Sequence, residues 1–224
     1  MIGRTLIIGG GEIDYEFTAD YLSKQKFDTV VCADSGLDAA DRLGLNVNFL
    51  MGDFDSVEKE TLSKFLELDC QGDNTKYIKY PKEKDYTDMH LVLEWTTGRK
   101  PSEIVILGAT GRRLDHFIAN INILMLPLEN NIPAYIIDKY NKICLADREH
   151  RISKENLWGK YISICPFTDK VTDVCLHGFK YPLTGETLRT GGSRTVSNEL
   201  ADGADEAIIS LGEGILIVIE SKDR

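Results

Sequence analysis

The stretch Phe49-Leu50-Met51-Gly52-Asp53-Phe54-Asp55-Ser56 joins a short apolar run to two carboxylates that stand two residues apart. We expect the apolar run to form a buried strand, so that both acids project from its carboxyl end, where open α/β sheets bind their ligands. Carboxylates at such an edge suit a hard cation such as Mg²⁺, which shares its remaining positions with substrate phosphates. Aspartates are also common in turns, and Ser56 is a plausible helix cap, so the stretch alone leaves both interpretations open.

Short apolar runs rich in β-branched residues alternate with helical patterns over residues 1–138, which is typical of βαβ units. The sequence therefore predicts an α/β fold whose N-terminal domain has a doubly wound, mostly parallel sheet. The predicted strands are Thr5–Ile8, Thr29–Ala33, Asn48–Met51, Lys76–Tyr80, Ile104–Leu107 and Ala134–Ile137. The predicted helices span about 13–25, 36–43, 57–68, 86–97 and 114–126.

The pattern changes after about residue 140, where short apolar runs are separated by Gly, Pro and polar turns without a convincing helix. We predict a smaller all-β domain over residues 157–224, joined to the first domain by a polar linker over 139–156. Gly212-Glu213-Gly214 is a favourable hairpin turn between the last two strands. The predicted strands of this domain are Tyr161–Cys165, Val171–Leu176, Ala207–Leu211 and Ile215–Ile219.

The composition excludes several classes of protein. A formal net charge of −10 argues against binding to nucleic acid or to an anionic membrane surface, both of which require basic patches. No apolar run is long enough to span a bilayer, and the first one ends at once in glycines and acids. The five cysteines show no C-x-x-C spacing, which predicts neither a zinc site nor a disulfide framework and favours a reduced cytoplasm.

Polar or glycine residues follow every predicted strand of the first domain. Because the carboxyl ends of parallel strands meet at one edge of a sheet, we expect these segments to form one polar edge. In chain order they are Gly9-Gly10-Gly11-Glu12, Asp34-Ser35-Gly36, the Asp53/Asp55 pair, Lys82 to Asp88, Gly108 to His116, and Asp138.

Familiar phosphate-binding motifs are weak or missing at this edge. Gly9-x-Gly11 is followed by Asp14 where a dinucleotide fingerprint needs its third glycine, so the glycines either let a phosphate approach the backbone or simply make a tight turn. No P-loop sequence occurs. An anionic substrate therefore needs local help from Arg, Lys or a metal ion.

Two helix starts carry further candidates for phosphate or metal binding. Asp85 is a plausible N-cap with Asp88 in the first turn, an arrangement that is also compatible with a phosphate pocket next to a metal ion. In the later helix, Arg113 is either a bidentate phosphate ligand or a surface arginine, and Asp115 either completes the acidic cluster or caps the helix. His116 leaves the same choice between nucleotide contact and capping.

The stretch from Gly191 to Leu200 concentrates hydroxyl and amide side chains in the second domain. These groups can hydrogen-bond a small polar heterocycle, although a polar β-turn explains them equally well.

These residues resemble the motifs of the thiamine pyrophosphokinase family, particularly its bacterial form. The resemblance runs in family order over nearly the whole chain. The matching segments are Ala33-Asp34-Ser35-Gly36, Gly52-Asp53-Phe54-Asp55-Ser56, Asp85-Tyr86-Thr87-Asp88, Gly111 to His116, and Ser197-Asn198-Glu199.

The resemblance implies a catalytic α/β domain, a C-terminal β-sandwich that helps to bind thiamine, and a homodimer with active sites between its subunits. It implies a transferase that moves the pyrophosphoryl group of ATP to thiamine, with Mg²⁺, giving AMP and thiamine diphosphate. One departure from the family is Arg112, which leaves open whether it or Arg113 faces the nucleotide.

The resemblance also assigns roles to individual residues. The implied catalytic set is Asp53, Asp55, Asp88, Asp115 and Arg113, with Asp53, Asp55 and Asp88 as metal ligands. Contacts to ATP or its phosphates are implied for Asp34, Ser35, Asp85, Thr87, Arg112 and His116. Contacts to thiamine are implied for Thr195, Ser197 and Asn198.

The assignment agrees with the chemistry, because metal and arginine together can neutralise charge on the transferred group and on the leaving α-phosphate. Two rival hypotheses use the same residues. A metal-dependent nucleotide or phosphoester hydrolase would direct water at the phosphate, and a nucleotide-sensing module would bind ATP without turnover.

Overall fold

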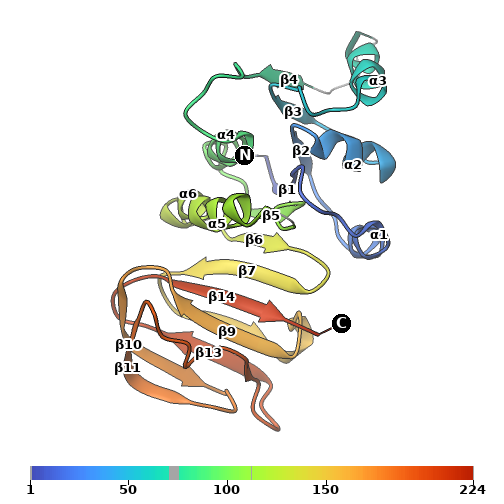
Figure 1. Cartoon of the computed structure of the whole chain (residues 1–224). Helices are drawn as coiled ribbons and strands as arrows, with labels where there is room; N and C mark the ends of the chain where they lie inside the picture. Colours follow the sequence, from blue (N-terminus) through green and yellow to red (C-terminus); the bar gives the residue numbers. More distant parts are fainter. Residues whose placement is uncertain (1, 71–75, 112, 224) are drawn as a thin grey trace. The chain divides into compact units, whose positions relative to one another are not determined.

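The computed structural model describes residues 2–70, 76–111 and 113–223. The chain divides into two compact units, Met1–Lys139 and Tyr140–Arg224. Figure 1 shows the first unit as strands flanked by helices and the second as strands. The structure thus confirms the prediction of a mostly parallel α/β fold followed by an all-β fold.

The first unit is built on a sheet in which each described strand runs parallel to its neighbours. The order across the sheet is β6-β5-β1-β2-β3-β4. Every predicted strand of this unit is present, with ends shifted by at most one residue. The strands are β1 Arg4–Ile8, β2 Thr29–Ala33, β3 Phe49–Gly52, β4 Lys76–Lys79, β5 Glu103–Leu107 and β6 Ala134–Ile137.

The central strands form because most of their residues are apolar on both faces, whereas the edge strand β4 has no buried residue. Leu6, Ile7 and Ile8 of β1 are at most 1% exposed, and Ile104 to Leu107 of β5 are nearly as deeply buried. A parallel sheet covered by helices on both sides favours such continuous apolar runs over strict alternation. Helices α4, α5 and α6 lie on one face in Figure 1 and α1, α2 and α3 on the other, so the unit is doubly wound.

The helices of the first unit agree with the predicted ranges except near Leu124, where the predicted helix 114–126 is two helices. Pro127 lacks an N–H group and is tolerated best in the first turn of a helix, so the helix restarts just before it. No helix in the described residues combines the length and apolarity needed to cross a membrane. The helices are α1 Tyr15–Ser23, α2 Gly36–Arg42, α3 Lys59–Cys70, α4 Asp88–Thr97, α5 Leu114–Ile123 and α6 Met125–Glu129.

The order of the strands reverses at β1. The chain moves outward from β1 through β2, β3 and β4, and then returns through α4 to place β5 on the other side of β1. Ile8 lies level with Cys32 of β2 and with Leu107 of β5, so the loops after these three strands start at the same height. Open α/β sheets bind ligands at such a reversal, beyond the carboxyl ends of the strands.

The second unit contains two antiparallel groups of strands, β12-β9-β14-β7 and β11-β10-β13-β8. Alternate residues of β14, including Leu216 and Val218, are buried, as expected when one face of an antiparallel sheet packs on a core. The strands are β7 Asn141–Ala146, β8 His150–Ser153, β9 Tyr161–Pro166, β10 Lys170–His177, β11 Leu183–Arg189, β12 Asn198–Glu199, β13 Glu206–Ser210 and β14 Leu216–Ser221, with a short 3₁₀ helix at Lys154–Asn156.

Two local predictions in this region were wrong. The segment 139–156 is not a bare linker, because it contains β7 and β8, and the residues 143–146 within it are buried. Its polar character comes from the charged segment 147–149 between the two strands and from charged residues such as Lys142, Arg151 and Lys154. Gly212-Glu213-Gly214 is not a hairpin turn, because β13 and β14 belong to different sheets and pair with other strands.

Candidate active site

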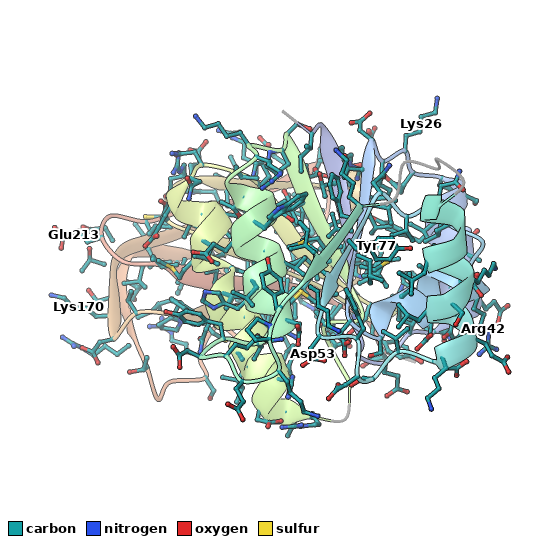
Figure 2. The ribbon with its side chains drawn as sticks, turned by 90° about the horizontal axis from the view of Figure 1, so that it is seen from above. Lys26, Arg42, Asp53, Tyr77, Lys170 and Glu213 are labelled. Carbon is teal, nitrogen blue, oxygen red and sulfur yellow. The ribbon has the colours of Figure 1, made fainter. Side chains whose placement is uncertain are left out.

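A pocket of about 690 Å³ lies in the first unit at the carboxyl ends of its strands. Loops that follow β1, β2, β3, β4 and β5 all contribute to its wall, and Asp53, labelled in Figure 2, marks its acidic side. The pocket therefore occupies the reversal point of the sheet, as the sequence predicts for the polar edge. The lining residues that bear side chains of functional interest are Glu12, Asp34, Ser35, Asp53, Ser56, Lys82, Lys84, Tyr86, Thr87, Asp88, Thr110, Arg113, His116 and Asn120.

The glycines after β1 are explained by close packing of the backbone. The amide of Gly9 donates to the carbonyl of Leu107 and the amide of Gly11 to that of Gly108, each at 2.8 Å. A Cβ atom on Gly11 would collide with the carbonyl oxygen of Gly108, and one on Gly10 would collide with Ser35. The glycines therefore allow the loop after β1 to pack closely against its neighbouring loops at the pocket floor. This close packing explains the glycines, and a dinucleotide-binding motif is not needed to explain them.

Two carboxylates of the pocket, Asp34 and Asp53, form a three-carboxylate group with the neighbouring Asp55, and oxygens of these three residues come within 4.8 Å of one another. Asp34 directly follows β2 and has a left-handed φ of 47°, and its amide donates to the carbonyl of Met51 at 2.9 Å. Gly52 permits this approach, because a Cβ there would lie 3.1 Å from the Cα of Asp34. The loops after β2 and β3 are therefore held together at this point.

The surroundings of Asp34 favour the binding of a cation, because they are acidic and, within the part of the chain that the structure describes, leave one of its oxygens unpaired. Burial raises the pKa of its carboxyl group, and the charges of Asp88 and Asp53 act in the same direction. Its Oδ1 is buried without a hydrogen-bond partner among the described residues, an arrangement that typically costs about 1–3 kcal/mol. Three clustered carboxylates with an unsatisfied oxygen fit a hard, oxygen-seeking divalent cation such as Mg²⁺.

Asp88 lies outside this three-carboxylate group and is paired with a lysine. Lys84 donates to Asp88 Oδ1 at 2.7 Å and also lies 3.6 Å from Asp53 Oδ2. Burial alone would lower the pKa of Lys84, but the two carboxylates outweigh it, so its pKa lies above its usual value. The sequence analysis gave Lys84 no role in the site. Its position between the end of β4 and the first turn of α4 could have indicated one, because that loop lies at the polar edge of the sheet.

Asp55 is paired with a second lysine at the outer side of the group. Lys82 bonds to Asp55 Oδ2, and this lysine side chain is 76% exposed. The hydrogen bond from Lys82 holds the pKa of Asp55 below its ordinary value. Two lysines of one loop thus contact the acidic group, one exposed and one largely buried.

Arg113 lines the pocket at the start of α5 and binds Asp115 through two hydrogen bonds, one of which measures 3.1 Å between Nε and Oδ1. Both side chains are exposed, and the arginine lowers the pKa of Asp115 to about 2. Asp115 therefore faces Arg113 and is not part of the three-carboxylate group. Arg112 lies outside the described residues.

The other candidates in the first unit divide between the pocket and the surface. Ser35, Thr87 and His116 line the pocket, whereas Asp85 is exposed and does not line it. The N-cap of α4 is Thr87, not Asp85, because Thr87 Oγ1 accepts from the amide of His90 at 3.2 Å.

Three further pocket residues were given no individual role by the sequence analysis. Asn120 is a buried polar residue on an otherwise apolar helix face, and its Nδ2 donates to the carbonyl of Ala109 at 2.8 Å. Glu12 directly follows the glycines, and Tyr86 stacks on His90 with ring centroids 4.3 Å apart. Asn120 and Glu12 carried a recognisable signal, since each places a polar group in or beside an apolar element.

Two of the three candidates of the second unit, Thr195 and Asn198, have side chains that bond to the main chain. Thr195 is buried and its hydroxyl donates to the carbonyl of Ile164. Asn198 is also buried, and its amide accepts from the N–H of Tyr181 at 3.0 Å and donates to the carbonyl of Tyr181 at 2.8 Å. Ser197 has a left-handed φ of 57° and an exposed side chain. Of these three side chains, Ser197 is the accessible one.

Fold and pocket together define a doubly wound α/β protein with an acidic ligand site at the reversal of its sheet, followed by an antiparallel β unit. Residues 20–136 match the family described as "Thiamin pyrophosphokinase, catalytic domain", and residues 149–216 match "Thiamin pyrophosphokinase, vitamin B1 binding domain". The chain belongs to the thiamin pyrophosphokinase family of enzymes.

Individual relatives agree with this membership. The chain is 36% identical to thiamine pyrophosphokinase of Bacillus subtilis over 173 residues, which cover 77% of each sequence. The crystal structure of thiamine pyrophosphokinase from that organism superposes with a TM-score of 0.85 at 31% identity, covering 99% of this chain and all of the other. A Geobacillus thermodenitrificans thiamin pyrophosphokinase gives a TM-score of 0.81 at 28% identity, with 98% of both chains covered.

Proposed function

We propose that this chain transfers the pyrophosphoryl group of ATP to the hydroxyl of thiamine, giving thiamine diphosphate and AMP. The observation that carries the proposal is the pocket of the first unit, whose lining combines the carboxylates of Asp34, Asp53 and Asp88 with the cationic side chains Lys82, Lys84 and Arg113. Phosphoryl transfer depends on positioning and on charge stabilisation more than on covalent chemistry, and this set of charges can supply both. The hydrolase and sensor hypotheses have no comparable support from the relatives.

The residues that would hold Mg²⁺ are Asp34, Asp53 and Asp55. This set contains Asp34 in place of Asp88 relative to the set that the resemblance implies, because the oxygens of Asp34, Asp53 and Asp55 lie within 4.8 Å of one another and Asp88 is outside that group. When bound, the ion neutralises charge on the phosphate oxygens. Asp88 then acts through Lys84, whose ammonium group it holds at the pocket wall.

The cationic side chains of the pocket bind the phosphates of ATP in this proposal. Arg113 presents a guanidinium group that matches phosphate oxygens in a bidentate manner, and Asp115 orients it. Lys84 provides a second positive charge from the loop between β4 and α4. Ser35, Thr87 and His116 add hydrogen-bond donors, so the transferred group is held from several directions.

Thiamine binding is assigned to the second unit, with residues 1–138 as the catalytic domain. Ser197 offers an accessible hydroxyl for contact with thiamine. Thr195 and Asn198 support that contact by fixing the surrounding loop, since their polar atoms already bond to the main chain. The thiazolium cation is attracted to an acidic site, which favours thiamine over an anionic acceptor.

The assembly proposed here is a homodimer in the cytoplasm, with active sites at the subunit interface. Leu114 and Ile118 stand one turn apart on α5 and are 68% and 58% exposed, next to pocket residues Arg113 and His116. Tyr181 and Val196 are exposed apolar residues of the second unit. Exposed apolar groups beside a site favour burial against a partner, here a second copy of the chain.

Product analysis tests the proposed reaction. The purified protein is incubated with Mg²⁺, ATP and thiamine, and the nucleotides and thiamine phosphates are separated by chromatography, with thiamine-free and EDTA controls. We expect AMP and thiamine diphosphate in equal amounts, both dependent on thiamine and on metal. Formation of ADP with thiamine monophosphate, or phosphate release without thiamine, would contradict the proposal.

A further inference from the structure

Lys84 stands out because a lysine side chain that is 12% exposed reaches two carboxylates from different elements. Its Nζ lies 2.7 Å from Asp88 Oδ1 at the start of α4 and 3.6 Å from Asp53 Oδ2 after β3. Lysine is rarely buried to this degree without a partner that compensates its charge. The ammonium group therefore links the loop after β3 to the first turn of α4.

The surroundings of this ammonium group are strongly acidic. Asp53 belongs to the three-carboxylate group, whose oxygens lie within 4.8 Å of one another and repel when no cation is present. Lys82 also contacts the group, but its exposed ammonium is screened by water and salt, so its influence is small. Lys84 is the less exposed and less screened of the two lysines at the group.

We propose that Lys84 is a positioning residue that serves as the internal counter-ion of the acidic group and makes the site select a metal–nucleotide complex over the free divalent cation. This inference rests on the proposed function for the location of the metal. Without nucleotide, the ammonium group and a divalent cation compete for the negative potential around Asp53. With nucleotide, the added phosphate charge accommodates both, because Lys84 lines the same pocket.

The direction of the effect follows from Coulomb's law. Replacing Lys84 by methionine keeps much of the side-chain volume and removes one positive charge next to a metal ligand. Free divalent cation should then bind at least about fivefold more tightly, because a nearby like charge has been removed. Lys84→Arg retains the charge and should leave the affinity within about twofold.

The test measures binding of Mn²⁺ alone by electron paramagnetic resonance, with and without a non-hydrolysable ATP analogue. Wild type, Lys84→Met, Lys84→Arg and the matched surface variant Lys82→Met are compared as full-length proteins. We expect Lys84→Met alone to bind free Mn²⁺ at least about fivefold more tightly, with a smaller gain on adding the analogue. Melting curves in EDTA and in Mn²⁺ should show a larger metal-induced rise for Lys84→Met than for wild type.

Three outcomes would overturn the inference. Unchanged or weaker Mn²⁺ binding by folded Lys84→Met, together with normal wild-type turnover, would refute it and leave the proposed function standing. An equal increase in Lys82→Met would show that removing either lysine charge suffices and that Lys84 has no special place. Absence of Mn²⁺ binding by wild type even with the analogue would refute the metal site and this inference together.

Discussion

Replacing Asp53 by asparagine tests the acidic group with little change in shape. The Asp53 side chain is 14% exposed, its Oδ1 accepts from the amide of Asp55 at 3.1 Å, and its Oδ2 faces Lys84 at 3.6 Å. Asparagine keeps an oxygen that can accept the first of these contacts and removes the negative charge. We therefore expect the local fold to persist and the electrostatics of the site to change.

The expected loss of activity follows from the role of the missing charge. Removing one group that stabilises developing charge in an active site typically costs about 2.7–4 kcal/mol, which corresponds to 10²–10³ in turnover. Asp34 and Asp55 remain, so a cation can still bind, but with one charged ligand fewer. Asp53→Asn should lower kcat by at least about a hundredfold, while the melting temperature stays close to that of wild type because Lys84 retains Asp88.

The assay follows thiamine-dependent AMP formation over a range of ATP, thiamine and Mg²⁺ concentrations, alongside thermal melting by circular dichroism. Asp20→Asn is the matched control, because Asp20 is a surface aspartate that also pairs with a lysine, Lys24. The control should retain wild-type turnover. Near-normal kcat in Asp53→Asn would refute the assignment of the acidic group.

Three further predictions concern the second unit and the pocket floor. Asn198→Ala should lower the free energy of unfolding by about 1–3 kcal/mol in urea titrations, because the main-chain N–H and carbonyl of Tyr181 lose their partner. The control Asn156→Ala, at an exposed residue, should leave the free energy of unfolding unchanged. An unchanged free energy of unfolding in Asn198→Ala would contradict the structural role of its side chain. His150 is half-buried, and burial lowers the pKa of its imidazole. The unfolded state therefore binds more protons, and the free energy of unfolding should fall as the pH drops below about 6.5. His150→Gln should flatten that decline, and an unaltered pH profile would exclude His150 as its source. Gly11→Ala should lower the free energy of unfolding by about 1–3 kcal/mol through overpacking, and it should reduce activity. Gly192→Ala should be tolerated, because a Cβ at Gly192 would have its nearest neighbour 3.5 Å away. Equal melting temperatures of the two variants would contradict the close-packing argument.

The fold of the first unit could be predicted because its strands, apart from the edge strand β4, are largely buried on both faces. Runs such as Thr29–Ala33 are therefore continuously apolar and bounded by polar loops, and the structure forms β2 over the same residues. The second unit carried weaker signals. In β11, Leu183 and Leu188 are buried but are separated by mostly exposed polar residues, so no strand pattern is recognisable. Strand β7 was not predicted, because the charged residues that follow it made the whole segment resemble a polar linker.

The pocket could be predicted at the level of loops but not of individual contacts. Parallel strands bring their carboxyl ends together whatever the side chains are, so Asp34 and Asp53 were expected at one edge. Which carboxylate joins the group and which pairs with Lys84 depends on loop geometry, including the left-handed φ of Asp34. The hydrogen bonds of Asn198 likewise depend on the distant residue Tyr181, with which no local sequence pattern connects it.

The most direct test of the central claim is anomalous diffraction from crystals grown with Mn²⁺ and a non-hydrolysable ATP analogue. The account predicts a manganese peak coordinated by oxygens of Asp34, Asp53 and Asp55, with the analogue's phosphates between that peak and Arg113. A peak held by Asp88 or Asp115 without Asp34, or phosphates bound outside this pocket, would contradict the account.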